Sequence, residues 1–248
     1  MESILSGLFQ IASPAGFLRR TILYRLVLLG LVLLVTGCTG PGFNLKNLVK
    51  TDIDMVADAH YQEVESLLKE LTIKLYKRNP KCLAAQKDIG RVHTVDTRID
   101  QLFSFRERRS FPELSVSGVD AIERALSDDF KGDRVFALMV GLTTMIRQSY
   151  SYQFEFFIHS ELDGQQLYYS ARNLEIALWR ISTYKDERGD LFILTNSTNG
   201  EIHNLSYERL FGKMIATQDM LAKIIADKNQ RFIKTVAQNV ATMAFFPI

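Results

Sequence analysis

The sequence predicts an all-α protein, a single irregular bundle of about six to eight helices that follows a signal peptide and a short tether. Apolar residues recur at three- and four-residue steps in several windows longer than ten residues. Capping residues, prolines and glycines stand at the edges of those windows. A short apolar stretch at residues 191–194, inside a polar loop, is read either as a strand or as a loop anchor.

Helices are expected, in chain order, over residues 52–78, 81–89, 119–130, 134–150, 165–184, 206–226 and 227–245. Thr51 or Asp52 can cap the first of these helices. Asn79 and Pro80 end it, because proline cannot continue a helix but suits the first position of the next one. Residues 95–103 carry apolar side chains that could form a further helix.

The later helices have clear boundary signals. Ser117 is the predicted cap of the helix at 119–130. Residues 134–150 are apolar nearly all round, which predicts a buried central helix. An Asp163-Gly164 pair precedes the helix at 165–184, in which Trp179 lies among apolar residues and is expected to be buried. The body has the size of one domain.

Composition excludes several classes of protein. The chain has 248 residues, of which 47% are hydrophobic and 23% charged, with two cysteines. These values exclude wholesale disorder, collagen-like repeats and a disulfide-rich miniprotein. A single long apolar run excludes a multispanning membrane protein. The net charge of +2 argues against a nucleic-acid-binding protein, so no nucleic-acid partner is expected.

The first 38 residues carry a targeting signal. An uncharged apolar run at residues 26–35 follows three arginines and ends in Val35-Thr36-Gly37-Cys38. Ten residues span about 15 Å as a helix, roughly half of a bilayer core. A basic start, a short apolar middle and small residues at the end make a secretory signal peptide. A short uncleaved anchor helix is the alternative.

Val35-Thr36-Gly37-Cys38 resembles the lipobox of bacterial lipoproteins. The resemblance implies that the Cys38 thiol receives a diacylglyceryl group and that a signal peptidase cleaves between Gly37 and Cys38, after which the new amino group receives a fatty acid such as palmitate. Residues 1–37 are then the signal peptide, 38–51 the lipidated cysteine and tether, and 52–248 the globular domain. The 25 residues before the apolar run are long for such a signal, which implies a downstream start or an extra amphipathic piece.

Thr39 follows the cysteine where an aspartate would imply retention at the inner membrane. The resemblance therefore implies an anchor in the outer membrane, on its periplasmic face, with the inner membrane as the alternative. The tether of 13 residues reaches at most about 45 Å. Of the 30 basic and 28 acidic residues, the signal peptide takes three arginines and one glutamate, so the mature chain carries 27 of each sign.

The candidate reactive residues are better explained by structural roles than by chemistry. Cys82 is the single cysteine of the body and has small apolar neighbours, which favours an inert buried thiol over a reactive one. His60 and Glu63 share a helix face that could hold a metal, but a solvated polar face is the favoured reading. The sequence has no nucleophile elbow, phosphate loop or dinucleotide motif. We therefore expect no metal, no cofactor and no catalytic activity.

Packing onto the bundle is the favoured interpretation of two aromatic segments, which are also the candidate partner-binding surfaces. One is the string at residues 150–157 and the other the segment 245–248. Aromatic side chains supply contact area at low entropic cost. The residues expected to contact a partner are Phe154, Phe156, Phe157, Phe245 and Phe246.

The leading hypothesis for function is a non-catalytic structural or assembly lipoprotein of the Gram-negative envelope, bound to the membrane through its acyl chains and to another envelope protein. The alternative is a binding module with a hydrophobic pocket for a small molecule or lipid between its helices. An enzyme whose site is scattered over distant residues is a third option. The lipobox resemblance covers residues 1–38 and concerns targeting alone.

Overall fold

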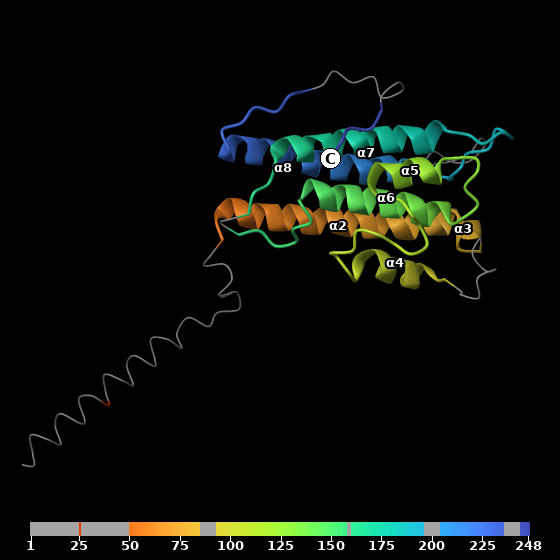
Figure 1. Cartoon of the computed structure of the whole chain (residues 1–248), viewed down its shortest axis with the longest axis horizontal. Coiled ribbons are helices and arrows are strands. Elements are labelled where there is room, and N and C mark those ends of the chain that lie inside the picture. Colours follow the sequence, from red (N-terminus) through yellow and green to blue (C-terminus); the bar gives the residue numbers. More distant parts are fainter. Residues whose placement is uncertain (1–24, 26–49, 85–92, 158–159, 196–203, 236–243) are drawn as a thin grey trace, which may run out of the picture. The chain divides into compact units, whose positions relative to one another are not determined.

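The computed structural model describes residues 25, 50–84, 93–157, 160–195, 204–235 and 244–248. The compact body is the unit Lys50–Ile248. Every regular element in its described part is a helix (Figure 1), which confirms the all-α prediction. The helices are α2 (Asp52–Arg78), α3 (Pro80–Ala84), α4 (Val95–Phe103), α5 (Gly118–Ala125), α6 (Arg134–Ser149), α7 (Gly164–Thr183) and α8 (Ser206–Lys228).

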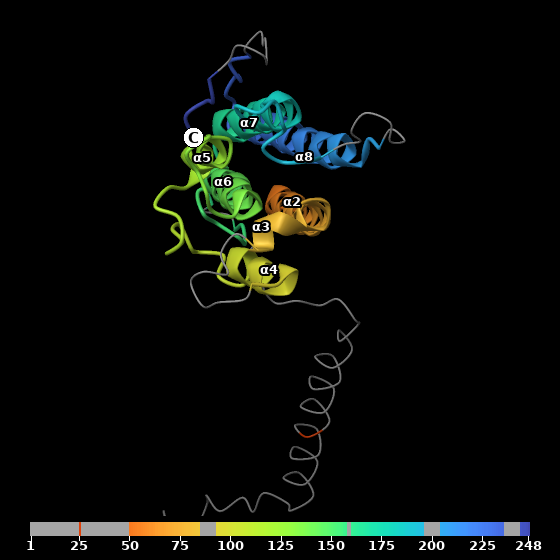
Figure 2. The same cartoon turned by 90° about the vertical axis from the view of Figure 1, so that its right-hand side faces the viewer.

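Four long helices form the frame of the bundle. The end-on view of Figure 2 shows α2 and α6 side by side, with α7 and α8 on one side of them and α4 on the other. Helix α8 runs antiparallel to α2, because Tyr207 Oη donates to Lys74 O at one end while Lys228 Nζ lies 3.4 Å from Asp54 Oδ1 at the other. Helix α5 packs along α6.

Helix α6 is the central helix. Fourteen of its sixteen residues are buried, which confirms the prediction from its nearly uniform apolarity. Gly141 allows α5 to approach closely, since a Cβ there would lie 2.6 Å from the Ile122 side chain and 2.7 Å from Gly118 O. Side chains of all four long helices meet around α6 and form one apolar core.

Two predicted helices are shorter in the structure. The helix expected at 119–130 ends at Ala125, where Arg134 Nη1 donates to the carbonyl oxygens of Ala125 and Ser127 at 2.7 and 2.8 Å. The arginine thereby satisfies acceptors that a continuing helix would have used. Of the short helix expected at 81–89, the structure describes a helix to Ala84, and residues 85–92 lie outside the described part.

The predicted helix at 227–245 is wrong for the residues that the structure describes, and residues 236–243 lie outside them. Helix α8 continues to Lys228, and the described residues 229–235 and 244–245 are not helical. Gln230 adopts a left-handed backbone with φ +52°, and Arg231 N donates to Ala226 O at 2.9 Å. This is the hydrogen-bond pattern of a helix C-terminus that ends in a left-handed residue. The helical spacing of apolar residues continues past Gln230 in the sequence, but the described residues 231–235 are not helical.

Three non-helical segments are fixed to helices by side-chain amides. In each case one Asn or Gln accepts from a backbone N–H and donates to the carbonyl of the same residue. We call this arrangement an amide clasp. The pairs are Asn79 with Leu194 at 2.8 and 2.8 Å, Gln165 with Lys234 at 2.8 and 3.2 Å, and Asn173 with Phe246 at 2.7 and 2.9 Å. Residues 191–194, expected as a strand or a loop anchor, make an isolated bridge through Leu191 and bury Ile193.

Candidate partner-binding surface

The predicted anchor residues Gly37 and Cys38 lie outside the described residues, as does Thr39. Among the helices that the structure describes, none is both long and apolar enough to cross a bilayer. The lipobox therefore stays a prediction from sequence.

The aromatic string after α6 divides into buried and accessible residues. Tyr150 is fully buried, and its hydroxyl donates to Gln218 at 2.7 Å. The expectation of an accessible Phe156 is wrong, because its ring is 1% exposed and lies 5.8 Å from the Tyr150 ring. Asp58 on α2 fixes it there by accepting from the Phe156 N–H at 2.8 Å. Phe154 and Phe157 are partly exposed.

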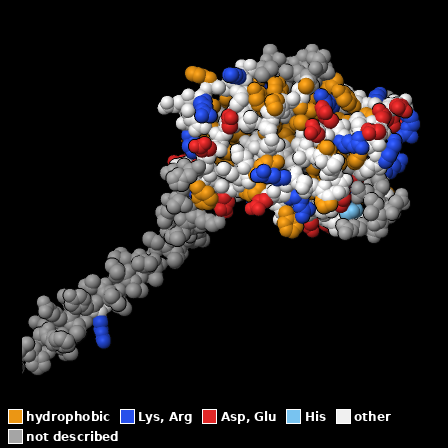
Figure 3. Space-filling view, viewed as in Figure 1, with side chains coloured by type: hydrophobic (Ala, Val, Ile, Leu, Met, Phe, Trp, Pro, Cys, Tyr) orange, Lys and Arg blue, Asp and Glu red, His pale blue; other side chains and the backbone are white. Residues whose placement is uncertain are grey.

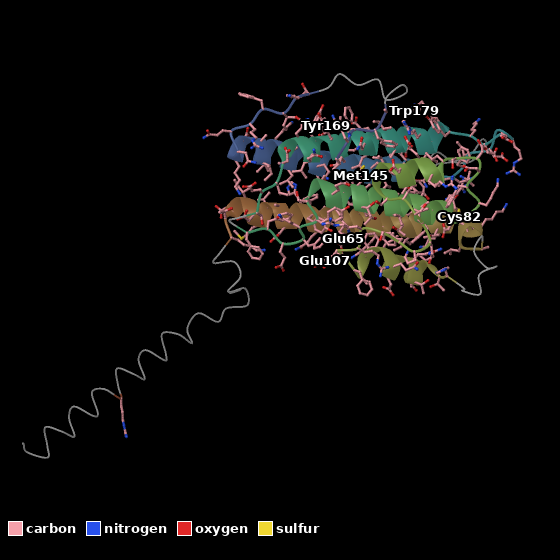
Figure 4. The ribbon with its side chains drawn as sticks, viewed as in Figure 1. Glu65, Cys82, Glu107, Met145, Tyr169 and Trp179 are labelled. Atoms are coloured by element: carbon pink, nitrogen blue, oxygen red, sulfur yellow. The ribbon has the colours of Figure 1, made fainter. Side chains whose placement is uncertain are left out.

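The segment 244–248 packs on α7. Phe246 stacks on Tyr169, with ring centroids 4.9 Å apart and planes 5° apart, and Asn173 clasps its backbone. The Arg180 guanidinium lies 4.4 Å from the centre of the Phe245 ring. Both phenylalanines thus have partners within the bundle, which corresponds to the favoured packing interpretation and not to a free docking tail. Figure 4 labels Tyr169 on the outer side of α7.

Phe154 lines an open hollow with a loop distant in sequence. The loop follows α4, and its Phe105 side chain is 62% exposed, so it is one of the few large exposed apolar side chains in the described part. The hollow has a volume of about 570 Å³. Its lining residues are Ser104, Phe105, Arg106, Glu107, Phe154 and Glu155. We call it the Phe105–Phe154 hollow.

The hollow is held in place by contacts from both of its sides. Arg106 binds Glu65 of α2 through two nitrogens, at 3.2 and 3.1 Å, and Lys69 contacts the same carboxylate at 2.7 Å. The Phe154 ring packs at 5.7 Å from Tyr61. Figure 4 shows Glu65 and Glu107 on the same side of the body, near α4. Two of the lining residues, Arg106 and Phe154, are therefore held by contacts with α2.

A strained turn directs the aromatic connector toward this hollow. Ser151 and Tyr152, directly after α6, both have left-handed backbones, with φ +54° and +55°. Such a conformation at a residue other than glycine costs about 1–3 kcal/mol and is frequent at functional sites. The Tyr152 N–H donates to Arg147 O at 2.7 Å, and the Arg109 guanidinium lies 4.3 Å from the Tyr152 ring centre. The turn thus brings Tyr152 and Phe154 beside the loop that follows α4.

The hollow has an amphipathic rim. The Arg108 guanidinium lies 4.8 Å from the Phe105 ring centre, and the Arg109 guanidinium lies 4.3 Å from the Tyr152 ring centre. A guanidinium that stacks on a ring keeps its N–H groups at the edge, where they can donate to a carboxylate. Glu107 and Glu155 are exposed on the same rim. The surface can therefore contact apolar side chains in its centre and charged groups at its edge.

A buried ion-pair network supports the same loop from below. Arg98 of α4 is fully buried, with Nη1 at 2.5 Å from Glu113 Oε2 and Nε at 3.3 Å from Asp133 Oδ2. Tyr76 Oη donates to Asp133 at 2.8 Å. Burial raises the pKa of Asp133, while the Phe136 N–H and Arg98 act in the opposite direction. The network joins α2, α4 and the start of α6, and through Glu113 it also holds the middle of residues 104–117.

The other sequence candidates have structural roles. Cys82 is half-buried and free, and burial raises the pKa of its thiol, although the Val135 and Arg134 N–H groups act in the opposite direction. His60 Nδ1 lies 3.2 Å from Thr217 O, a contact between α2 and α8. Within the described ranges, no three His, Cys, Asp or Glu side chains are placed to hold a metal ion.

Sequence reasoning found Phe154 but missed Phe105, Arg108 and Arg109. Helical periodicity gives no signal for a loop, and the pairing of residues 104–109 with 152–155 depends on tertiary packing. No known family model, curated protein or solved structure matches the chain. Function is therefore inferred from the residues of this chain alone.

Proposed function

We propose that the protein is a periplasmic lipoprotein, anchored in the outer membrane, that serves as a structural or assembly partner in an envelope complex. The observation that carries the proposal is the sequence Val35-Thr36-Gly37-Cys38 at the end of an apolar run. The compact body begins at Lys50, so few residues separate it from the lipidated cysteine. Such a body works next to its membrane.

The Phe105–Phe154 hollow is the proposed contact surface for the partner. Aromatic and arginine side chains dominate the binding energy of protein interfaces, and apolar centres with polar rims are typical of them. The exposed Phe105 and the two stacked arginines provide these features. We expect the partner to insert an apolar side chain beside Phe105 and to place a carboxylate against Arg108 or Arg109.

The alternative, a lipid pocket between the helices, has less support. One narrow hollow between α2 and α6, beside Tyr61 and Arg147, has about 0 Å³ of free space, and another beside Asp54 and Leu162 has about 10 Å³. Neither can hold an acyl chain. A wider hollow of about 940 Å³ lies beside Cys82 but is open and bordered by charged side chains. Figure 3 shows charges of both signs crowded at that end of the body.

The anchor is tested with Cys38→Ala. The variant is expected to remain an uncleaved precursor and to take up no radiolabelled fatty acid, whereas the wild type is cleaved and labelled. Labelling that persists in the variant would refute the lipobox. Membrane fractionation tests sorting separately, and wild-type protein found wholly in the inner membrane would contradict the outer-membrane assignment.

The contact surface is tested by placing a photo-crosslinking amino acid at Phe105 in the full chain. Met220 on α8 is the matched control, because its side chain is 61% exposed and that of Phe105 is 62% exposed. We expect one defined envelope adduct from position 105 and none from 220, and we expect Phe105→Ala to lose the complex while its melting temperature stays unchanged. The same adducts from both positions would contradict a contact at the hollow.

A further inference from the structure

One aromatic side chain at the end of α8 has no place in the core. Phe232 is 98% exposed, more than the other large apolar side chains of the described part. Arg231 and Lys234 flank it and are both exposed, and Ile233 between them packs against the core. We call residues 228–234 the basic-aromatic segment. Its acidic neighbour in sequence is the exposed Asp227.

The segment has a fixed position. Gln165 at the start of α7 clasps the Lys234 backbone at 2.8 and 3.2 Å, and Asn229 Nδ2 donates to Leu162 O at 3.1 Å. Ile233 anchors the middle of the segment to the apolar core. Phe232 is therefore exposed because the backbone on both sides of it is fixed in this orientation.

This end of the bundle is also where α2 begins. Lys228 Nζ lies 3.4 Å from Asp54 Oδ1 in the first turn of α2. From Cys38 to Lys50 the chain has 12 residues, which reach at most about 40 Å when extended. If Cys38 is lipidated as proposed above, the membrane lies within that reach of Lys50, which precedes α2 at the end where Lys228 contacts Asp54.

We propose that the basic-aromatic segment contacts the bilayer that holds the acyl chains of Cys38, an inference that rests on the proposed lipid anchor. Aromatic rings prefer the boundary between headgroups and acyl chains, where Phe232 would insert. Arg231 and Lys234 would meet lipid phosphates. Asp54 partly neutralises Lys228, so the ring is the principal contact and the two outer cations assist it on anionic lipid.

The test uses the full lipidated chain in vesicles of phosphatidylethanolamine and phosphatidylglycerol with brominated acyl chains, which quench tryptophan by contact. The native tryptophan is removed by Trp179→Phe, and a reporter is introduced by Phe232→Trp. The matched control is Leu205→Trp, because Leu205 is 63% exposed and precedes α8 at its opposite end. We expect loss of most of the emission from position 232 and little loss from position 205. Equal quenching at the two positions would overturn the inference.

A fatty-acid label on Cys38, read in the same preparation, separates this inference from the proposed function. If Cys38 carries no label, both the anchor and the membrane contact are wrong. If Cys38 is labelled and position 232 is not quenched, the membrane contact alone is wrong. Adding Arg231→Gln and Lys234→Gln is expected to reduce quenching in vesicles that contain phosphatidylglycerol and to leave it unchanged in purely zwitterionic vesicles. If the chains with and without these two substitutions are quenched equally in vesicles that contain phosphatidylglycerol, the two cations have no role in the contact.

Discussion

The long helices and the non-helical segments of this bundle are held by different forces. Helices α2, α6, α7 and α8 bury continuous apolar faces around one core. The segments around Leu194, Lys234 and Phe246 each bring only one or two apolar side chains to that core, and each is also held by an amide clasp, in which two hydrogen bonds join one side chain to the segment's backbone. The same chain thus contains a cooperative core and locally attached segments.

The difference has energetic consequences. Burying one large apolar side chain contributes about 1.5–3 kcal/mol, and a helix of this core buries several. A net hydrogen bond contributes about 0.5–1.5 kcal/mol, so a clasp contributes roughly as much as one core side chain. Loss of a clasp is therefore expected to release one segment, whereas loss of a core side chain weakens the whole fold.

The largest effect is expected from Phe211→Ala on α8. Phe211 is fully buried, and its truncation leaves a cavity in the core, which typically costs about 3–5 kcal/mol of unfolding free energy. The matched control is Phe232→Ala, the same substitution at a side chain that is 98% exposed, for which less than about 0.5 kcal/mol is expected. Chemical denaturation measures both. Equal losses would contradict the assignment of these two residues to core and surface.

An intermediate effect is expected from Asn173→Ala. The Asn173 side chain is fully buried in α7, and without it the N–H and carbonyl of Phe246 lose their partner. We expect a loss of about 1–3 kcal/mol together with faster amide exchange at Phe246. A variant that exchanges at Phe246 as slowly as the wild type would show that the Tyr169 stack, not the clasp, holds the segment.

The smallest effect is expected from Gln165→Ala, because its clasp with Lys234 is exposed to water. Water can replace both hydrogen bonds, so the global stability should change by less than about 0.5 kcal/mol. Local amide exchange at Lys234 should nevertheless become faster. A global loss as large as that of Asn173→Ala would mean that burial does not distinguish the clasps.

Helical periodicity predicted the core because it depends on neighbours in sequence. The helix at 52–78 has the predicted boundaries, and the nearly uniform apolarity of 134–150 correctly indicated the buried α6. The prediction of a helix after Lys228 was wrong for the same reason. Its apolar residues continue a helical spacing, but Gln230 takes a left-handed backbone and Gln165 fixes Lys234 from another helix.

The candidate surface was less accessible to sequence reasoning. Aromatic content identified Phe154, but it could not separate that residue from the buried Phe156, whose backbone is held by Asp58 of a different helix and whose ring lies beside Tyr150. Trp179, expected to be buried among apolar neighbours, is partly exposed and packs edge-on against Tyr184 at 5.6 Å. Contacts across long sequence separations decide both cases.

The most direct test of this two-part organisation is native-state hydrogen exchange of the full chain at increasing, sub-denaturing concentrations of denaturant. Amides in the middle of α6 are expected to exchange through global unfolding, with a strong dependence on denaturant. The amides of Leu194, Lys234 and Phe246 are expected to exchange through local opening, with little dependence. If the three clasped amides follow the same denaturant dependence as α6, the segments belong to the cooperative core and the division into core and locally attached segments is wrong.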